Sequence, residues 1–165
     1  MKLQLLYQKM IAHNLGDARR IQHFIKVHSL AKLIGEMEGL SKEELEILEA
    51  AALVHDIGIR PAEKKYGYSN GKLQEQEGPE PAKRLLEEAG FSESVQDRVC
   101  FLVAHHHTYN RIEGADYQIL VEADFLVNLY EDGADEKAVQ TAYERIFRTE
   151  SGKEICKMMF GFKEA

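Results

Sequence analysis

The chain has 165 residues, of which 44% are hydrophobic and 30% are charged, a composition typical of a globular protein. Its length fits one domain that buries about two-thirds of its unfolded surface, and the absence of a long uncharged apolar run predicts no membrane-spanning segment. The 21 basic and 28 acidic residues give a net charge of −7. This charge disfavours binding to a nucleic-acid polymer or an anionic membrane, although a small anion needs only a few local cations.

The cysteines and the N-terminal segment predict a cytoplasmic protein. Cys100 and Cys156 lie far apart and form no CxxC pattern, so they suggest neither a disulfide framework nor a thiolate zinc site. The first residues begin like a signal peptide, but Lys9 interrupts the apolar stretch and no small-residue cleavage pattern follows. We therefore expect the N-terminal segment to form a helix.

Helical periodicity without any long apolar–polar alternation predicts an all-α fold. The first helix is expected over residues 2–13. The second begins at Asp17, which is a suitable N-cap, and ends at Gly39. The third opens with a capping box formed by Ser41 and Glu44 and is expected to end at Gly58.

Residues 59–78 show the weakest helical pattern, and we expect them to form an irregular loop that is functional or mobile. Beyond this loop the spacing predicts five more helices, from Pro81 to Gly90, from Ser92 or Ser94 to about His106, and over 116–131, 134–148 and 153–160. The sequence contains no repeat and no linker. It therefore predicts one compact helical bundle over 1–165, with a motif-bearing core at 17–130 and C-terminal helices at 134–160.

Several polar residues occupy positions where helical periodicity predicts apolar side chains. His55 and His106 each continue an i, i+3, i+4, i+7 apolar pattern, and Asp124 lies within another one. A buried carboxylate costs several kcal/mol unless it is paired or binds a metal. In the second expected helix both His23 and His28 lie near apolar stripes, and periodicity does not choose between them.

His55 and Asp56 are adjacent, so they lie about 100° apart around a helix and reach one cation only beside the helix end, which Gly58 supplies. The helix C-terminus also favours a cation there. Taken alone, a histidine on an apolar stripe is more often a packed core residue, but the neighbouring aspartate and the distant Asp124 favour metal binding. Two imidazoles and two carboxylates would suit a first-row divalent ion.

These residues resemble the HD-domain superfamily of metal-dependent phosphohydrolases. His23, the run His55-Asp56-Ile57-Gly58 and the pair Ala123-Asp124 are similar to the H…HD…D pattern of that superfamily, and the resemblance extends from about Asp17 to Tyr130. It implies a helical bundle of the HD-domain type. The implied metal ligands are His23, His55, Asp56 and Asp124, which would hold one divalent ion of Mn, Fe, Co, Ni or Zn.

The chain also departs from parts of that pattern. Binuclear members have a histidine at the start of the helix after the loop, where this chain has the run Gln74-Glu75-Gln76-Glu77, so we expect a single ion. His105 and His106 match a later His-His pair of the superfamily. Because His107 follows directly, it is ambiguous which two of these three histidines correspond to that pair. The Gly-Tyr-Pro element of cyclic-dinucleotide phosphodiesterases is missing after His107, so that activity is not expected.

The resemblance implies hydrolysis of a small phosphate ester or anhydride, with a nucleotide as the expected substrate, and leaves open phosphomonoester or phosphodiester cleavage. Asp56 is expected to accept a proton from the attacking water and His106 to protonate the leaving group. Arg60, Lys64 and Arg111 are expected to bind phosphate oxygens.

Two other interpretations remain at this point. One is a non-catalytic sensor that binds a metal and a nucleotide, and the other is a helical protein whose histidines only pack. Arg19 and Arg20 are interpreted as part of a solvated helix face. The sequence does not choose an oligomeric state.

Overall fold

The computed structural model describes residues 1–164, and within that range every regular element is a helix, which confirms the all-α prediction. The helices are α1 (Lys2–His13), α2 (Ala18–Met37), α3 (Lys42–Val54), α4 (Ile59–Tyr66), α5 (Gly71–Glu77), α6 (Pro79–Glu88), α7 (Glu93–His105), α8 (Ala115–Glu131), α9 (Glu136–Arg145) and α10 (Glu150–Phe160). None of the helices in residues 1–164 combines the length and apolar character needed to cross a bilayer.

The starts of α2 and α3 are set by the side-chain caps expected from the sequence. The carboxylate of Asp17 accepts a hydrogen bond from the backbone N–H of Arg20 at 3.1 Å. At α3 the Ser41 hydroxyl accepts from the Glu44 N–H at 3.2 Å, while the Glu44 carboxylate accepts from the Ser41 N–H at 2.8 Å. Both contacts satisfy N–H groups that have no partner inside the helix, so they fix where each helix begins.

The expectation of an irregular loop over 59–78 is wrong, because α4 and α5 occupy most of that segment. Pro61 lies in the first turn of α4, where a missing N–H costs nothing, and Gly67 ends the helix at φ 81°. Asn70 then caps α5 by accepting from the Leu73 N–H at 2.9 Å. Ala62 is the one buried residue of α4, and α5 has none, so neither short helix shows the apolar stripe of a core helix in the sequence.

The third helix also ends earlier than expected, at Val54 rather than at Gly58. Residues 55–58 form a tight turn that leads directly into α4. A Cβ atom at Gly58 would lie 2.6 Å from the Gln74 carbonyl oxygen and 2.7 Å from the Gly78 nitrogen. The missing side chain therefore allows the turn to pack against the junction of α5 and α6.

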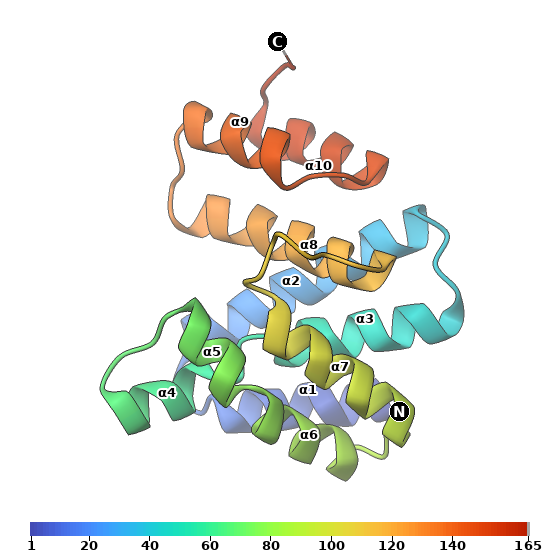
Figure 1. Ribbon diagram of the computed structural model, residues 1–165, viewed down its shortest axis with the longest axis vertical. Coiled ribbons are helices and arrows are strands. Elements are labelled where there is room, and N and C mark those ends of the chain that lie inside the picture. The colour runs from blue at the N-terminus through green and yellow to red at the C-terminus, as the bar shows by residue number, and fades with distance from the viewer. Residues whose placement is uncertain (165) are drawn as a thin grey trace.

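The helices are arranged around a continuous apolar core. Figure 1 shows α8 crossing α2 in the middle of the molecule, with α9 and α10 at one end and α1 and α6 at the other. The helix α2 packs against α3 and α8, while α7 packs against α3 and α6. Buried apolar side chains extend from Leu6 in α1 to Phe162 beyond α10. This packing brings α2, the end of α3 and α8 together.

Candidate metal centre

The packed helices place four of the predicted site residues around one point. His23 comes from α2, His55 stands at the C-cap of α3, Asp56 lies in the following turn, and Asp124 comes from α8. The turn begins with a hydrogen bond from the Ile57 N–H to the Val54 carbonyl at 3.0 Å. Because the chain leaves the helix here, His55 and Asp56 can face the same point although they are adjacent in sequence.

The facing atoms are Nε2 of both histidines, Oδ2 of Asp56 and Oδ1 of Asp124. His23 Nε2 lies 3.2 Å from Asp56 Oδ2 and 3.3 Å from Asp124 Oδ1. His55 Nε2 lies 3.4 Å from Asp56 Oδ2 and 3.3 Å from Asp124 Oδ1, and the two Nε2 atoms are 3.2 Å apart. All four side chains are buried, with at most 9% of any residue exposed. These four residues, named here the metal cluster, have the donor types and spacing of a cation site.

Hydrogen bonds on the outer side of each imidazole ring fix which nitrogen faces inward with a lone pair. His55 Nδ1 donates to the Ala52 carbonyl at 2.8 Å, and a carbonyl oxygen only accepts. His23 Nδ1 donates to Glu131 Oε1 at 2.8 Å. In the neutral rings both Nε2 atoms are therefore free acceptors directed at the cluster. A carbonyl or carboxylate behind a histidine is the arrangement that orients imidazole ligands toward a metal.

The metal cluster consequently brings together four atoms that accept hydrogen bonds and, with neutral rings, none that donates. While both rings are neutral, Asp124 Oδ1 is buried without a hydrogen-bond partner in residues 1–164. An orphaned buried carboxylate oxygen is costly, and a divalent cation would satisfy it together with the three other donors. The two carboxylate charges would also balance the charge of such an ion. The residues therefore fit a divalent metal.

Without a cation, protons balance the two carboxylates. Burial lowers the pKa of His23, but hydrogen bonds with Asp124 and Asp56 outweigh it and raise the pKa to about 9. Burial also opposes protonation of His55, yet the Asp56 charge and the hydrogen bond with Asp124 raise its pKa well above the ordinary value. Burial raises the pKa of Asp124, and the contacts with His23 and His55 reverse this and hold it below the ordinary value. Protons and a metal ion would thus compete for the same atoms.

A second set of possible ligands lies on the other oxygen of Asp56. His106 Nε2 is 3.0 Å and His107 Nε2 is 3.9 Å from Asp56 Oδ1. The Gln74 amide nitrogen donates to the Ser69 hydroxyl at 3.1 Å, so its oxygen faces His107 Nε2 at 2.5 Å and must accept the proton of that nitrogen. A protonated Nε2 cannot bind a cation. This second set therefore offers fewer free ligand atoms than the metal cluster.

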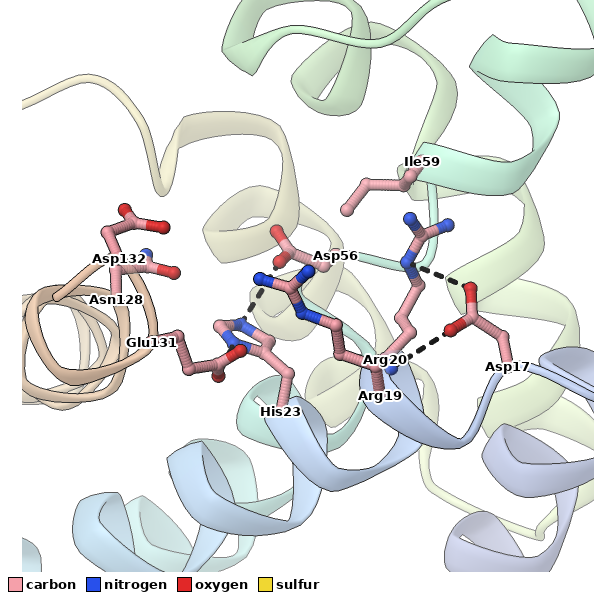
Figure 2. A pocket seen from close by; sticks show the side chains of 9 residues that line it. All are labelled: Asp17, Arg19, Arg20, His23, Asp56, Ile59, Asn128, Glu131 and Asp132. Carbon is pink, nitrogen blue, oxygen red and sulfur yellow. Dashed lines mark hydrogen bonds and ion pairs between the residues drawn. The ribbon is translucent and has the colours of Figure 1, made fainter.

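A pocket with a volume of about 260 Å³ opens onto the metal cluster and reaches His23 and Asp56. Figure 2 shows the side chains of Arg19 and Arg20, which line this pocket from the start of α2, and that of Glu131, which lines it from α8. Arg20 pairs with Asp17 at 3.6 Å and with Glu63 at 3.5 Å. Arg19 has no ion pair within residues 1–164, and it provides the free positive charge at the rim.

Sequence reasoning missed these pocket residues, although a signal was present. Arg19 and Arg20 precede His23 by four and three positions, which is the spacing that places side chains on one helix face. Glu131 follows Asp124 by seven positions and therefore lies on its face two turns later. The two arginines were interpreted as part of a solvated helix face, but they lie on the same face as His23, which is a candidate metal ligand.

The three expected phosphate-binding residues do not line this pocket. Arg60 on α4 donates to the backbone carbonyls of His13 at 2.8 Å and Leu15 at 3.4 Å, so it joins α4 to the connection between α1 and α2. Lys64 is exposed on the same helix. Arg111 lies on the connection between α7 and α8 and lines a different pocket. The structure does not bring these three residues together with the metal cluster.

The family model described as HD domain matches residues 20–149. The crystal structure of a predicted HD superfamily hydrolase from an uncultured Thermotogales bacterium is similar at 25% sequence identity, with a TM-score of 0.69 over 96% of this chain and 85% of that chain.

The crystal structure of Bacillus subtilis YpgQ shares the fold at 17% identity, with a TM-score of 0.67 over 98% of this chain and 90% of that chain. A search of curated protein sequences finds no match. The fold comparison agrees with the helical bundle of HD-domain type expected from the sequence.

Proposed function

The chain belongs to the HD-domain family, and from this premise we propose that it is a metal-dependent phosphohydrolase that cleaves a small phosphate ester or anhydride, with a nucleotide as its substrate. The observation that carries the proposal is the convergence of His23, His55, Asp56 and Asp124 on one buried point beside an open pocket. The similarity to a protein described as a predicted hydrolase supports the same reaction class.

We assign one divalent ion to the metal cluster, with Mn, Fe, Co, Ni and Zn as the ions that suit two imidazoles and two carboxylates. His23, His55, Asp56 and Asp124 would hold it. When bound, the ion would polarise a phosphoryl oxygen and lower the pKa of a water molecule. The proton on His107 Nε2, which Gln74 accepts, supports a single ion.

We assign the proton transfers of the hydrolysis to Asp56 and His106. His106 Nδ1 donates to the Val103 carbonyl at 2.8 Å, so its Nε2 is the atom that holds or releases a proton beside Asp56 Oδ1, 3.0 Å away. Attack of water forms one P–O bond and breaks another. Asp56 accepts the proton from the water, and His106 Nε2 delivers a proton to the leaving oxygen. Both residues are buried, which keeps their geometry fixed.

Among the acidic residues Asp17, Glu131 and Asp132 that line the pocket, Arg19 is the feature that supports a small anionic substrate. A metal cluster with two carboxylates and a divalent ion is nearly neutral, so additional cations must oppose the charge of a phosphate. Arg19 supplies such a charge at the pocket rim, and a guanidinium can bind two phosphate oxygens at once. The net charge of −7 disfavours a nucleic-acid polymer as substrate.

The test is a substrate panel assayed with the purified full chain. Nucleoside mono-, di- and triphosphates, cyclic nucleotides and a chromogenic phosphodiester are each incubated with manganese, cobalt or nickel, and release of phosphate, pyrophosphate or chromophore is measured. We expect metal-dependent release from at least one nucleotide. Tight nucleotide binding without release from any substrate would replace the enzyme with the sensor alternative.

Two matched variants test whether any activity depends on the metal cluster. Asp56→Ala should abolish both metal loading and turnover, because it removes a ligand and the proton acceptor together. Asp97→Asn changes an exposed carboxylate on α7 and should leave both unchanged. An active Asp56→Ala protein that contains no metal would refute the assignment.

A further inference from the structure

A second pocket, with a volume of about 290 Å³, lies between the connection of α7 to α8 and the connection of α9 to α10. Arg111 comes from the first connection, while Arg145 ends α9 and Arg148 follows it. No residue of this pocket lines the pocket at the metal cluster. Three guanidinium groups from two separate segments thus share one cavity. This cavity is called the arginine pocket below.

The arginine pocket has fixed walls. The Arg148 guanidinium donates to the carbonyls of Phe147 and Arg145 at 2.8 Å each, and to that of Glu144 at 3.2 Å. Gln118 on α8 donates to the Ile146 carbonyl at 2.9 Å, which ties the end of α9 to α8. A cation held by three backbone contacts loses little conformational entropy when it binds an anion.

No described carboxylate forms an ion pair with the arginine side chains of the arginine pocket, although the buried Glu122 carboxylate lies close by and accepts from the Arg148 backbone N–H at 3.1 Å. Within residues 1–164 the arginine side chains that form ion pairs are Arg20 and Arg98. Arg111, Arg145 and Arg148 therefore each lie more than 4 Å from every described carboxylate. Three arginines without a carboxylate partner thus line one cavity in a chain with a net charge of −7. Their mutual repulsion would be relieved by a bound anion.

We propose that the arginine pocket binds the phosphate group of a small anion, at a site separate from the metal cluster. Guanidinium groups match phosphate oxygens in pairs, and this cavity offers three of them, with Arg148 already oriented. The cavity size and the overall negative charge favour a small ligand over a polyanion. The phosphate can be free inorganic phosphate or part of a nucleotide, since both present the same oxygens.

The proposal is tested on the ¹⁵N-labelled full chain after its metal has been removed with a chelator. Inorganic phosphate and a nucleoside monophosphate are titrated separately, and amide chemical shifts are followed by NMR. Both ligands should shift the amides of residues 109–112 and 145–148. Equal affinity for the two would identify a site for phosphate alone, and tighter nucleotide binding would identify a nucleotide site. Removing the metal makes the result independent of the proposed hydrolysis.

Two double variants supply the comparison. Arg111→Gln with Arg145→Gln should weaken phosphate binding by about 100-fold, because losing each charged hydrogen-bond donor costs roughly tenfold or more. Lys83→Gln with Arg84→Gln makes the same change in net charge at exposed positions on α6 and should have little effect.

The proposal is overturned if phosphate shifts none of the amides at 109–112 and 145–148. It is also overturned if the Arg111 and Arg145 double variant binds like the unmodified protein, or if both double variants lose affinity equally. The dispersed amide spectrum of each variant shows that it is folded.

Discussion

Loading the metal-free protein with a divalent ion should raise its melting temperature, and Asp124→Asn should remove most of that rise. Asp124 is 3% exposed, and its Oδ1 lies 3.3 Å from Nε2 of both His23 and His55. Asparagine keeps the shape of the side chain but removes its charge. The substitution therefore weakens the cation site with little change in packing.

The size of the effect follows from linkage. Removing one partner from a buried charged set costs about 3–5 kcal/mol, which corresponds to a loss of metal affinity of roughly two to four orders of magnitude. At a metal concentration of about 1,000 times Kd, binding stabilises the unmodified protein by about 4 kcal/mol. For a chain of this length that raises Tm by roughly 8–16 °C. At the same metal concentration the variant should show about a third of this rise or less.

The assay is calorimetric unfolding of chelator-treated protein with and without manganese, at one fixed metal concentration. Asp97→Asn, which changes an exposed carboxylate on α7, should show the full rise of the unmodified protein. The readout is the rise on loading, so any effect of Asp124→Asn on the metal-free protein cancels. If Asp124→Asn shows the same rise as the unmodified protein, the metal cluster is not where the ion binds.

Other perturbations give distinct outcomes. Metal affinity measured by titration should increase between pH 6 and pH 9, because the metal must displace the protons held by His23, whose pKa is about 9, and by His55, whose pKa is also raised; a flat profile over this range would contradict this. Glu131→Gln should weaken metal affinity by about 10- to 100-fold, because it removes the negative charge of the group that accepts from His23 Nδ1, whereas Glu154→Gln at an exposed position of α10 should not. Gly58→Ala should lower the free energy of unfolding by about 3 kcal/mol in a denaturant titration, since its Cβ would meet backbone atoms within 2.8 Å. Gly35→Ala, whose Cβ would meet only leucine side-chain ends, should cost clearly less, and equal costs would refute the packing argument.

The sequence predicts most helix starts correctly because their signals are local. The Asp17 cap and the Ser41–Glu44 capping box each depend on residues within four positions, and both are present in the structure. The α4 and α5 helices were missed for the opposite reason. The two helices pack against each other, and α5 also packs against α6 and α7, which are contacts that a local pattern does not record.

The candidate ligands could be placed on apolar helix faces from periodicity, but the choice of His23 over His28 needed the family resemblance. The structure gives the physical reason for that choice. His28 Nδ1 lies 3.1 Å from the Tyr7 hydroxyl and its Nε2 lies 3.0 Å from Glu49 Oε1, so its ring is engaged with α1 and α3 away from the cluster. Both histidines satisfy the same periodicity, and only the neighbouring helices distinguish them.

The positive side chains around the site were the hardest to predict. Arg60 and Arg111 were expected to bind phosphate oxygens because they are cations, yet their positions depend on how the connections between helices are folded. Arg60 binds backbone carbonyls near the end of α1, and Arg111 lies in the arginine pocket. Arg19 reaches the pocket because it shares a helix face with His23.

The most direct test of the metal cluster is an anomalous difference map from a crystal of the manganese-loaded protein, with data collected on both sides of the metal absorption edge. We predict one strong peak bounded by Nε2 of His23 and His55, Oδ2 of Asp56 and Oδ1 of Asp124. A peak elsewhere, or no peak at this point in fully loaded protein, would contradict the account.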